Sequence, residues 1–362
     1  MVRMNSHPNG QASRTYLNRV ATAVPDNECH QTFLNGLPLI LPPEKTKRLQ
    51  RVASQSQIQK RYSVLNPLIG SSEDEAYYRP GRFPSTGERM QTYRKEALPL
   101  ASRAIRDLNL SEAELSGVTH LIVTSCTGFY APGLDIELIR EWNLNPGVRR
   151  LLITYMGCYA GISGLRAAQD IVRSHPDARV LMVNLELCSL HLQESAPMDR
   201  LVSFLLFADG CAASLITAED DGFELMEFQS SLGLSSQDRM QWMVEDQGFA
   251  MTLDIRVPSL IQEILDQEKD SIFNGVDPDH IGQWAVHPGG RAILDSVQSS
   301  FDLDQSLMEA SRTVLRDYGN MSSATVMFVL ESLLKQRTGS RSEMGMAMAF
   351  GPGLTVESMS FR

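Results

Sequence analysis

Residues 151–164 read LLITYMGCYAGISG, an apolar stretch that passes through a glycine into a second, periodic segment. Its first five residues are rich in branched and aromatic side chains, which predicts a short buried strand. From Ile162 to about residue 173, apolar residues recur at helical spacing, which predicts a helix. Three glycines in this stretch allow tight turns and close backbone approach. The stretch therefore predicts a strand–turn–helix unit with Cys158 at the turn.

Cys158 is a candidate nucleophile because of this position. Unpaired backbone N–H groups and the positive end of the helix dipole meet at a helix start. Such surroundings lower the pKa of a thiol and favour the reactive thiolate. A buried structural cysteine is the alternative, and it describes most cysteines. On this residue alone both interpretations stay open.

Two further segments have the same layout. Residues 283–295, QWAVHPGGRAILD, predict an apolar strand that ends at His287, a break at Pro-Gly-Gly, and then a helix. Residues 317–325, DYGNMSSAT, place Asn320 between a glycine and an apolar helix. Asn320 either caps that helix or aims its amide into a pocket. A thiol, an imidazole and an amide at three such junctions suit acyl transfer through a thioester, with N–H groups stabilising an enolate or oxyanion.

The rest of the chain alternates strand and helix patterns, which indicates a layered α/β protein. Strands are predicted near residues 16–23, 120–126, 179–185 and 211–216, and helices near residues 32–56 with a break at Pro42-Pro43, 89–108, 258–273 and 326–333.

Composition narrows the function. A net charge of −10 over 362 residues argues against general nucleic-acid binding. The five cysteines are widely spaced and include no CxxC pair, so we expect reduced thiols in a cytoplasmic enzyme rather than disulfides or a metal site. Residues 1–14 are polar, and we expect them to be disordered and not a secretory signal. No apolar run reaches about 18 residues, so we expect no membrane insertion.

Four motifs together resemble one known family. Cys158, HPGG at 287–290, GNMSS at 319–323 and FGPGLTVE at 350–357 resemble the type III polyketide synthases, the chalcone synthase-like family, with a likeness to its bacterial members. The resemblance implies an α/β, thiolase-like αβαβα five-layered fold made of two similar halves. We place the boundary near residue 218, so that residues 15–218 carry the cysteine and residues 219–362 carry the histidine and asparagine.

The resemblance also implies the reaction. Cys158 would carry the acyl chain, while His287 and Asn320 would promote decarboxylation of malonyl-CoA. Malonyl units would be condensed iteratively onto an acyl-CoA starter, and the chain would close to a pyrone or phenolic ring. CoA thioesters would be the substrates, with no cofactor and no metal. A homodimer is the expected assembly.

Substrate contacts follow from the same resemblance. Arg48 and Arg51 share a helix face where the family binds CoA phosphates, although a solvated face is the alternative. Phe207 would guard the passage to the cavity, and Met251 replaces a second guarding aromatic, which favours longer aliphatic chains. Further cavity positions are expected at Cys126, Cys188, His191, Ser322, Gly289 and, across the dimer interface, Ala131, whose bond to Pro132 is expected to be cis.

Three other functions remain as alternatives. One is a single-round β-ketoacyl synthase III-type enzyme that uses an acyl-carrier protein, and a second is a naphthalene-forming polyketide synthase that uses malonyl-CoA alone. The third is a non-catalytic binding protein, which the intact Cys158, His287 and Asn320 set argues against. The starter, the number of extensions and the ring closure depend on several cavity side chains jointly, so no single motif fixes them.

Overall fold

A nine-stranded mixed sheet organises the described part of the chain. The computed structural model describes residues 13–337 and 343–362, apart from residues 72, 74, 195–196 and 235–236. The strand order is β11-β12-β13-β8-β1-β7-β6-β4-β5. The strands are β1 (Thr15–Ala23), β4 (His120–Ser125), β5 (Arg149–Thr154), β6 (Val180–Leu187), β7 (Asp209–Thr217), β8 (Phe223–Leu232), β11 (Ile281–Val286), β12 (Met344–Gly351) and β13 (Thr355–Phe361).

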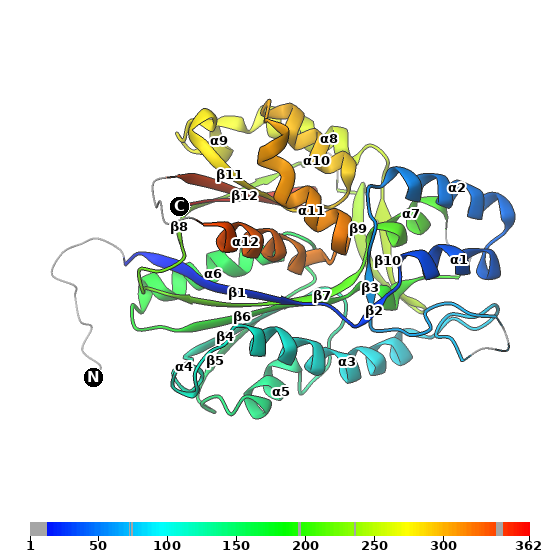
Figure 1. Ribbon diagram of the computed structural model, residues 1–362, viewed down its shortest axis with the longest axis horizontal. Coiled ribbons are helices and arrows are strands. Elements are labelled where there is room, and N and C mark those ends of the chain that lie inside the picture. Colours follow the sequence, from blue (N-terminus) through cyan, green and yellow to red (C-terminus); the bar gives the residue numbers. More distant parts are fainter. Residues whose placement is uncertain (1–12, 72, 74, 195–196, 235–236, 338–342) are drawn as a thin grey trace.

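Helices complete a five-layered architecture, as Figure 1 shows. The middle layer contains α6 (Ala160–Ser174) and α12 (Thr325–Gln336), which contact each other and strands of both halves of the sheet. One outer layer contains α3 (Thr86–Asp107), α4 (Glu112–Ser116) and α5 (Leu134–Glu141), and the other contains α8 (Val257–Gln267), α9 (Lys269–Phe273) and α10 (Arg291–Ser300). The thiolase-like prediction is therefore confirmed. The predicted boundary near residue 218 falls in the connection between β7 and β8.

The remaining elements are further helices, strands and turns. They are α1 (His30–Ile40), α2 (Pro43–Gln55), α7 (Met198–Leu206), α11 (Glu309–Tyr318), the short pair β2 (Asn27–Glu28) and β3 (Tyr62–Ser63), the hairpin β9 (Met240–Glu245) and β10 (Gly248–Leu253), and the 3₁₀ turns η1 (Cys188–His191), η2 (Pro278–His280), η3 (Gln305–Met308) and η4 (Ser322–Ala324). None of the described helices has the length and apolar character to cross a membrane.

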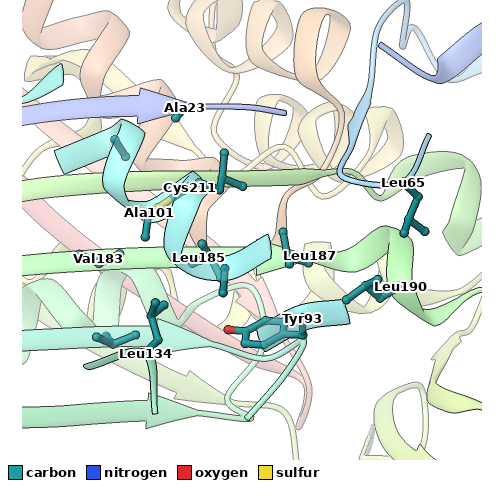
Figure 2. Close-up of a cluster of buried hydrophobic side chains, with 14 of the residues drawn as sticks. Ala23, Leu65, Tyr93, Ala101, Leu134, Val183, Leu185, Leu187, Leu190 and Cys211 are labelled. Carbon is teal, nitrogen blue, oxygen red and sulfur yellow. The ribbon is translucent and has the colours of Figure 1, made fainter. Parts of the chain in front are cut away.

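Helix α3 shows how local sequence and core packing agree. Ser85 and Glu88 form a capping box at its start. Its buried face carries alanines, whose small side chains let the helix lie close to the sheet, and Tyr93; Figure 2 shows Ala101 and Tyr93 in this core. The Tyr93 hydroxyl donates to Ser125 Oγ at 2.7 Å, which satisfies the only polar atom of a buried ring. The packing of α3 and this hydrogen bond fix the position of the end of β4, which lies beside the candidate active site.

Two predictions about elements were wrong in part. The strand around residue 151 is present but exposed, because β5 is the edge of the sheet and Leu151 and Leu152 are 40% and 47% exposed. The helix predicted over residues 258–273 is interrupted at Glu268. The break at Pro42-Pro43 is confirmed. Residues 1–12 of the segment expected to be disordered lie outside the described residues.

Candidate active site

The three predicted junctions meet at one cavity. Cys158, His287 and Asn320 all line a cavity of about 830 Å³. Cys158 lies in the turn between β5 and α6, His287 follows β11 directly, and Asn320 lies between α11 and η4. The side chains come from elements far apart in the sequence, and the central helices α6 and α12 bring those elements together.

Glycines make this convergence possible. A Cβ on Gly161 would lie 2.6 Å from the carbonyl oxygen of Ser323, so only glycine lets α6 approach η4 this closely. Gly157 has a φ of +95°, and a Cβ there would lie 2.4 Å from Pro352. The turn over residues 351–353 therefore packs directly against the turn that carries Cys158.

Asn320 lines the cavity and is not the cap of the helix that follows, because the N-cap residue of α12 is Ala324. Its Oδ1 accepts from the Ser322 backbone N–H at 2.8 Å and from the Thr325 hydroxyl at 3.4 Å. Its Nδ2 donates to the Gly289 carbonyl at 3.3 Å and also forms a hydrogen bond with the sulfur of Cys158. Because Oδ1 is held by the start of η4, Nδ2 is fixed on the cavity side. The amide thus accepts from the first residue of η4 and presents a donor to the site.

His287 is buried with no hydrogen bond to either ring nitrogen from the described residues. Its backbone is fixed, since its N–H donates to Met348 O at 2.8 Å and its carbonyl accepts from Gly289 at 2.9 Å. Burial lowers the pKa of the imidazole to about 3. The ring is therefore neutral here, and its nitrogens are free to bind an acyl oxygen or take a proton.

The pKa of Cys158 differs from the sequence prediction. Burial raises it to about 12, while hydrogen bonds from Ser322 and Asn320 act in the opposite direction. The prediction of a lowered pKa was wrong for this arrangement, because α6 begins only at Ala160 and desolvation outweighs the helix start. Burial therefore favours the neutral form of both side chains.

A second, smaller chamber lies behind Cys158. It has a volume of about 20 Å³ and shares Cys158, Phe207 and Met251 with the outer cavity. Phe207 and Met251 thus separate the two spaces, where a guarding role was predicted. Trp242, which the sequence analysis missed, faces Met251 across the β9–β10 hairpin and fills the chamber wall. A chamber of this size has room for about one water molecule.

The other predicted cavity residues divide into three groups. Cys126, Cys188 and Ser322 line the inner chamber, and Gly289 lines the outer cavity. Burial raises the pKa of both additional cysteines, as expected for shape-setting thiols. His191 lies outside both linings: its ring stacks on Phe249 at 4.3 Å and supports the wall from behind. Ala131 is exposed in this chain, and its bond to Pro132 is cis as predicted.

The cavity mouth carries basic residues, of which only some were predicted. Arg48 lines the cavity, whereas Arg51 is exposed outside it. Arg256 and Arg291 also line the cavity and were missed. Arg256 forms an ion pair with Asp254 at 2.8 Å. Because these opposite charges lie two residues apart in the sequence and cancel, the local charge gave no signal for Arg256. Among the described residues, no three His, Cys, Asp or Glu side chains gather as a metal site requires.

Comparison with known proteins places this geometry in a family. The model of the N-terminal domain of chalcone and stilbene synthases matches residues 9–220, and the model of their C-terminal domain matches residues 227–362. The chain belongs to the chalcone and stilbene synthase family. It is a type III polyketide synthase, and thus an acyltransferase.

Individual relatives agree with this assignment. The synthase is 32% identical over 342 residues to the alpha-pyrone synthesis polyketide synthase-like Pks18 of Mycobacterium tuberculosis, covering 89% of this chain and 84% of Pks18. Its fold is similar to PKS-I of the brown alga Ectocarpus siliculosus, with a TM-score of 0.87, 28% identity and coverage of 98% and 99% of the two chains. It is also similar to the C-terminal type III polyketide synthase domain of Steely1, a type I/III hybrid from Dictyostelium, with a TM-score of 0.85, 25% identity and coverage of 96% and 99%.

Proposed function

We propose that the synthase condenses malonyl-CoA units decarboxylatively onto an acyl group held on Cys158 and releases a pyrone. The observation that carries the proposal is the convergence of Cys158, His287 and Asn320 on one cavity wall. Pks18 is named for alpha-pyrone synthesis, which supports a pyrone over a phenolic ring. Matches to both domain models favour polyketide synthesis over a single-round, carrier-protein-dependent ketoacyl synthase.

The first step loads the starter. The Cys158 thiol transfers its proton to a ring nitrogen of His287, which has no other partner among the described residues. The sulfur attacks the acyl thioester, the new S–C bond forms, and CoA leaves as its thiol after taking back a proton. The Ser322 and Asn320 side chains, which hydrogen-bond the sulfur, stabilise the transient thiolate.

The second step extends the chain. The C–C bond of malonyl-CoA to its carboxylate breaks, CO₂ leaves, and the electron pair enters the thioester as an enolate. Asn320 Nδ2 and a His287 N–H donate to the enolate oxygen, where negative charge develops. The enolate carbon attacks the Cys158 thioester and displaces the thiolate. The lengthened chain returns to Cys158 for a further round and finally cyclises. The reaction as proposed draws on no metal or organic cofactor.

CoA thioesters are the proposed substrates, with Arg48 at the cavity mouth and Arg51 beyond it available to the CoA phosphates. All five cysteines are free, and we propose that the enzyme acts in the cytoplasm.

We propose a homodimer in which the exposed apolar edge of β5 is covered by a second copy. Leu151 and Leu152 on β5 and Phe129 after β4 are exposed apolar residues, at 40%, 47% and 53% exposure. Ala131 lies close to Phe129 in sequence and is exposed, so it is available to reach the partner's cavity.

Product analysis tests the function. The purified enzyme is incubated with malonyl-CoA and a ladder of acyl-CoA starters, and products are read by mass spectrometry. Cys158→Ala abolishes condensation, and product formation at a normal rate would exclude Cys158 as the nucleophile. A single condensation that requires a carrier protein would instead support the ketoacyl synthase. Malonyl-CoA as sole substrate with a naphthalene product would support the other alternative.

A second variant tests the enolate role. Asn320→Ala removes one donor to a developing oxyanion, a loss that costs about 10²–10³ in kcat. We expect decarboxylation of malonyl-CoA to fall by this factor while loading of the starter on Cys158 changes little. Equal losses at both steps would contradict the assigned role.

A further inference from the structure

Arg61 is a buried arginine with no ion-pair partner among the described residues. It lies just before β3 and is 3% exposed. Its Nε donates to His30 Nδ1 at 3.0 Å, and its guanidinium lies 4.7 Å from the centre of the Phe33 ring. Nη1 donates to two backbone carbonyls, Phe204 O at 2.6 Å and Phe207 O at 2.8 Å. Nη2 is buried and has no hydrogen-bond partner in the part of the chain that the structure describes.

The two carbonyls belong to the end of α7. The last carbonyls of a helix have no partner within the helix, and a cation at this end is favourable. Phe207 is the C-cap of α7 and separates the outer cavity from the inner chamber. By binding the carbonyls of residues 204 and 207, Arg61 fixes the peptide on which the Phe207 ring is mounted.

The same peptide is joined to Asn320. The Asn320 N–H donates to Leu206 O at 2.8 Å, and the Ala208 N–H donates to Asn320 O at 2.9 Å. Residue 319 is a glycine with a φ of +72°, and a Cβ there would lie 2.9 Å from Arg61 Cγ. The Arg61 side chain therefore packs between the end of α7 and the residue before Asn320.

We propose that Arg61 is a positioning residue that holds the Asn320 amide and the Phe207 ring in register for the decarboxylation step. The inference rests on the proposed function, because it requires Asn320 to act on the enolate. The guanidinium reaches two carbonyls while a second nitrogen contacts His30, a geometry that neither lysine nor an apolar side chain reproduces. Its contacts join the end of α7 to the residue before Asn320, so what it aligns explains its placement.

The test compares two steps in the same sample. Arg61→Met and Arg61→Lys are prepared in the full chain, with loading of Cys158 measured by intact mass after reaction with a starter acyl-CoA. Decarboxylation is measured as CO₂ released from malonyl-CoA. Misplacing a group by about 1 Å can reduce a rate about 10²-fold. We expect the ratio of decarboxylation to loading to fall about 100-fold in Arg61→Met and less in Arg61→Lys, with the KM for malonyl-CoA changed less than kcat.

Arg89→Met is the matched control. Arg89 is as buried as Arg61 and also donates to backbone carbonyls, those of Pro84, Leu190 and Leu192, but not to the end of α7. We expect its ratio to stay within threefold of the wild type. The ratio counts only enzyme that can load, so partial misfolding does not alter it.

Several outcomes would overturn the role of Arg61. They are a parallel loss of both steps, an equal fall of the ratio in Arg89→Met, an unchanged ratio in both Arg61 variants, or a failure of both Arg61 variants to load starter at all. A wild-type enzyme that neither loads nor decarboxylates would instead reject the proposed function itself.

Discussion

Trp242 determines how much space lies behind the nucleophile, and its removal is the sharpest test of where the growing chain is accommodated. The half-buried indole donates its N–H to the Cys126 carbonyl at 2.7 Å. Its ring centre lies 6.5 Å from that of Phe207 and 5.9 Å from that of Phe249. With this side chain in place, the inner chamber measures about 20 Å³. We predict that Trp242→Ala joins the chamber to the space that the indole leaves.

The expected stability cost is moderate. Losing one hydrogen bond costs about 1 kcal/mol. A new cavity costs about 24 cal/mol per Å³, so roughly 100 Å³ of added space costs about 2.4 kcal/mol. The sum of about 3 kcal/mol lowers the melting temperature by several degrees but leaves a folded enzyme. Each acyl methylene buried in the new space gains about 0.8 kcal/mol, so two methylenes shift starter preference by roughly tenfold.

The assay measures kcat/KM for acyl-CoA starters of increasing length, with products identified by mass spectrometry. Trp242→Ala shifts the optimum to longer starters or adds extension rounds, whereas Trp242→Phe, which retains most of the ring, stays near the wild type. A folded Trp242→Ala enzyme with an unchanged starter and product profile would show that the chain does not enter this chamber. The growing chain would then lie in the outer cavity.

Three further predictions concern other parts of the synthase. Met251→Phe narrows the passage beside Phe207 and biases the enzyme toward shorter starters or products, and an unchanged profile in the same assay would contradict this. Burial lowers the pKa of His191 to about 3 from an unfolded value near 6.5. The unfolded chain therefore binds more protons between these values, and stability falls as pH drops below 6.5, by at most about 5 kcal/mol. Thermal unfolding from pH 7.5 to 5 should show a shallower loss in His191→Gln than in the wild type; identical slopes would refute the assignment. Leu151→Asp with Leu152→Asp places charge on the exposed edge of β5 and shifts the enzyme to monomers in light scattering, while an unaltered dimer would place the interface elsewhere.

Local patterns were sufficient for many elements. The β-branched run at residues 120–126 and the alternation of strands with helices predicted β4 and the layered class correctly, since those signals depend on side chains a few residues apart. The helix boundaries around Pro42-Pro43 followed from proline chemistry. By contrast, the apolar content of residues 151–155 predicted burial, and β5 is exposed because it lies at the sheet edge. Position in a sheet depends on pairings with distant strands.

The chemical types at the site were fixed by the chain itself: a thiol, an imidazole and an amide, each beside glycines at a strand or helix end. Their grouping around one cavity, the burial that raises the pKa of Cys158, and the closure of the inner chamber by Trp242 were decided only by tertiary structure. The side chains that hydrogen-bond Cys158, those of Ser322 and Asn320, lie more than a hundred residues away in the sequence. A pKa or a cavity volume is a property of such assembled surroundings, so no single stretch of sequence contains it.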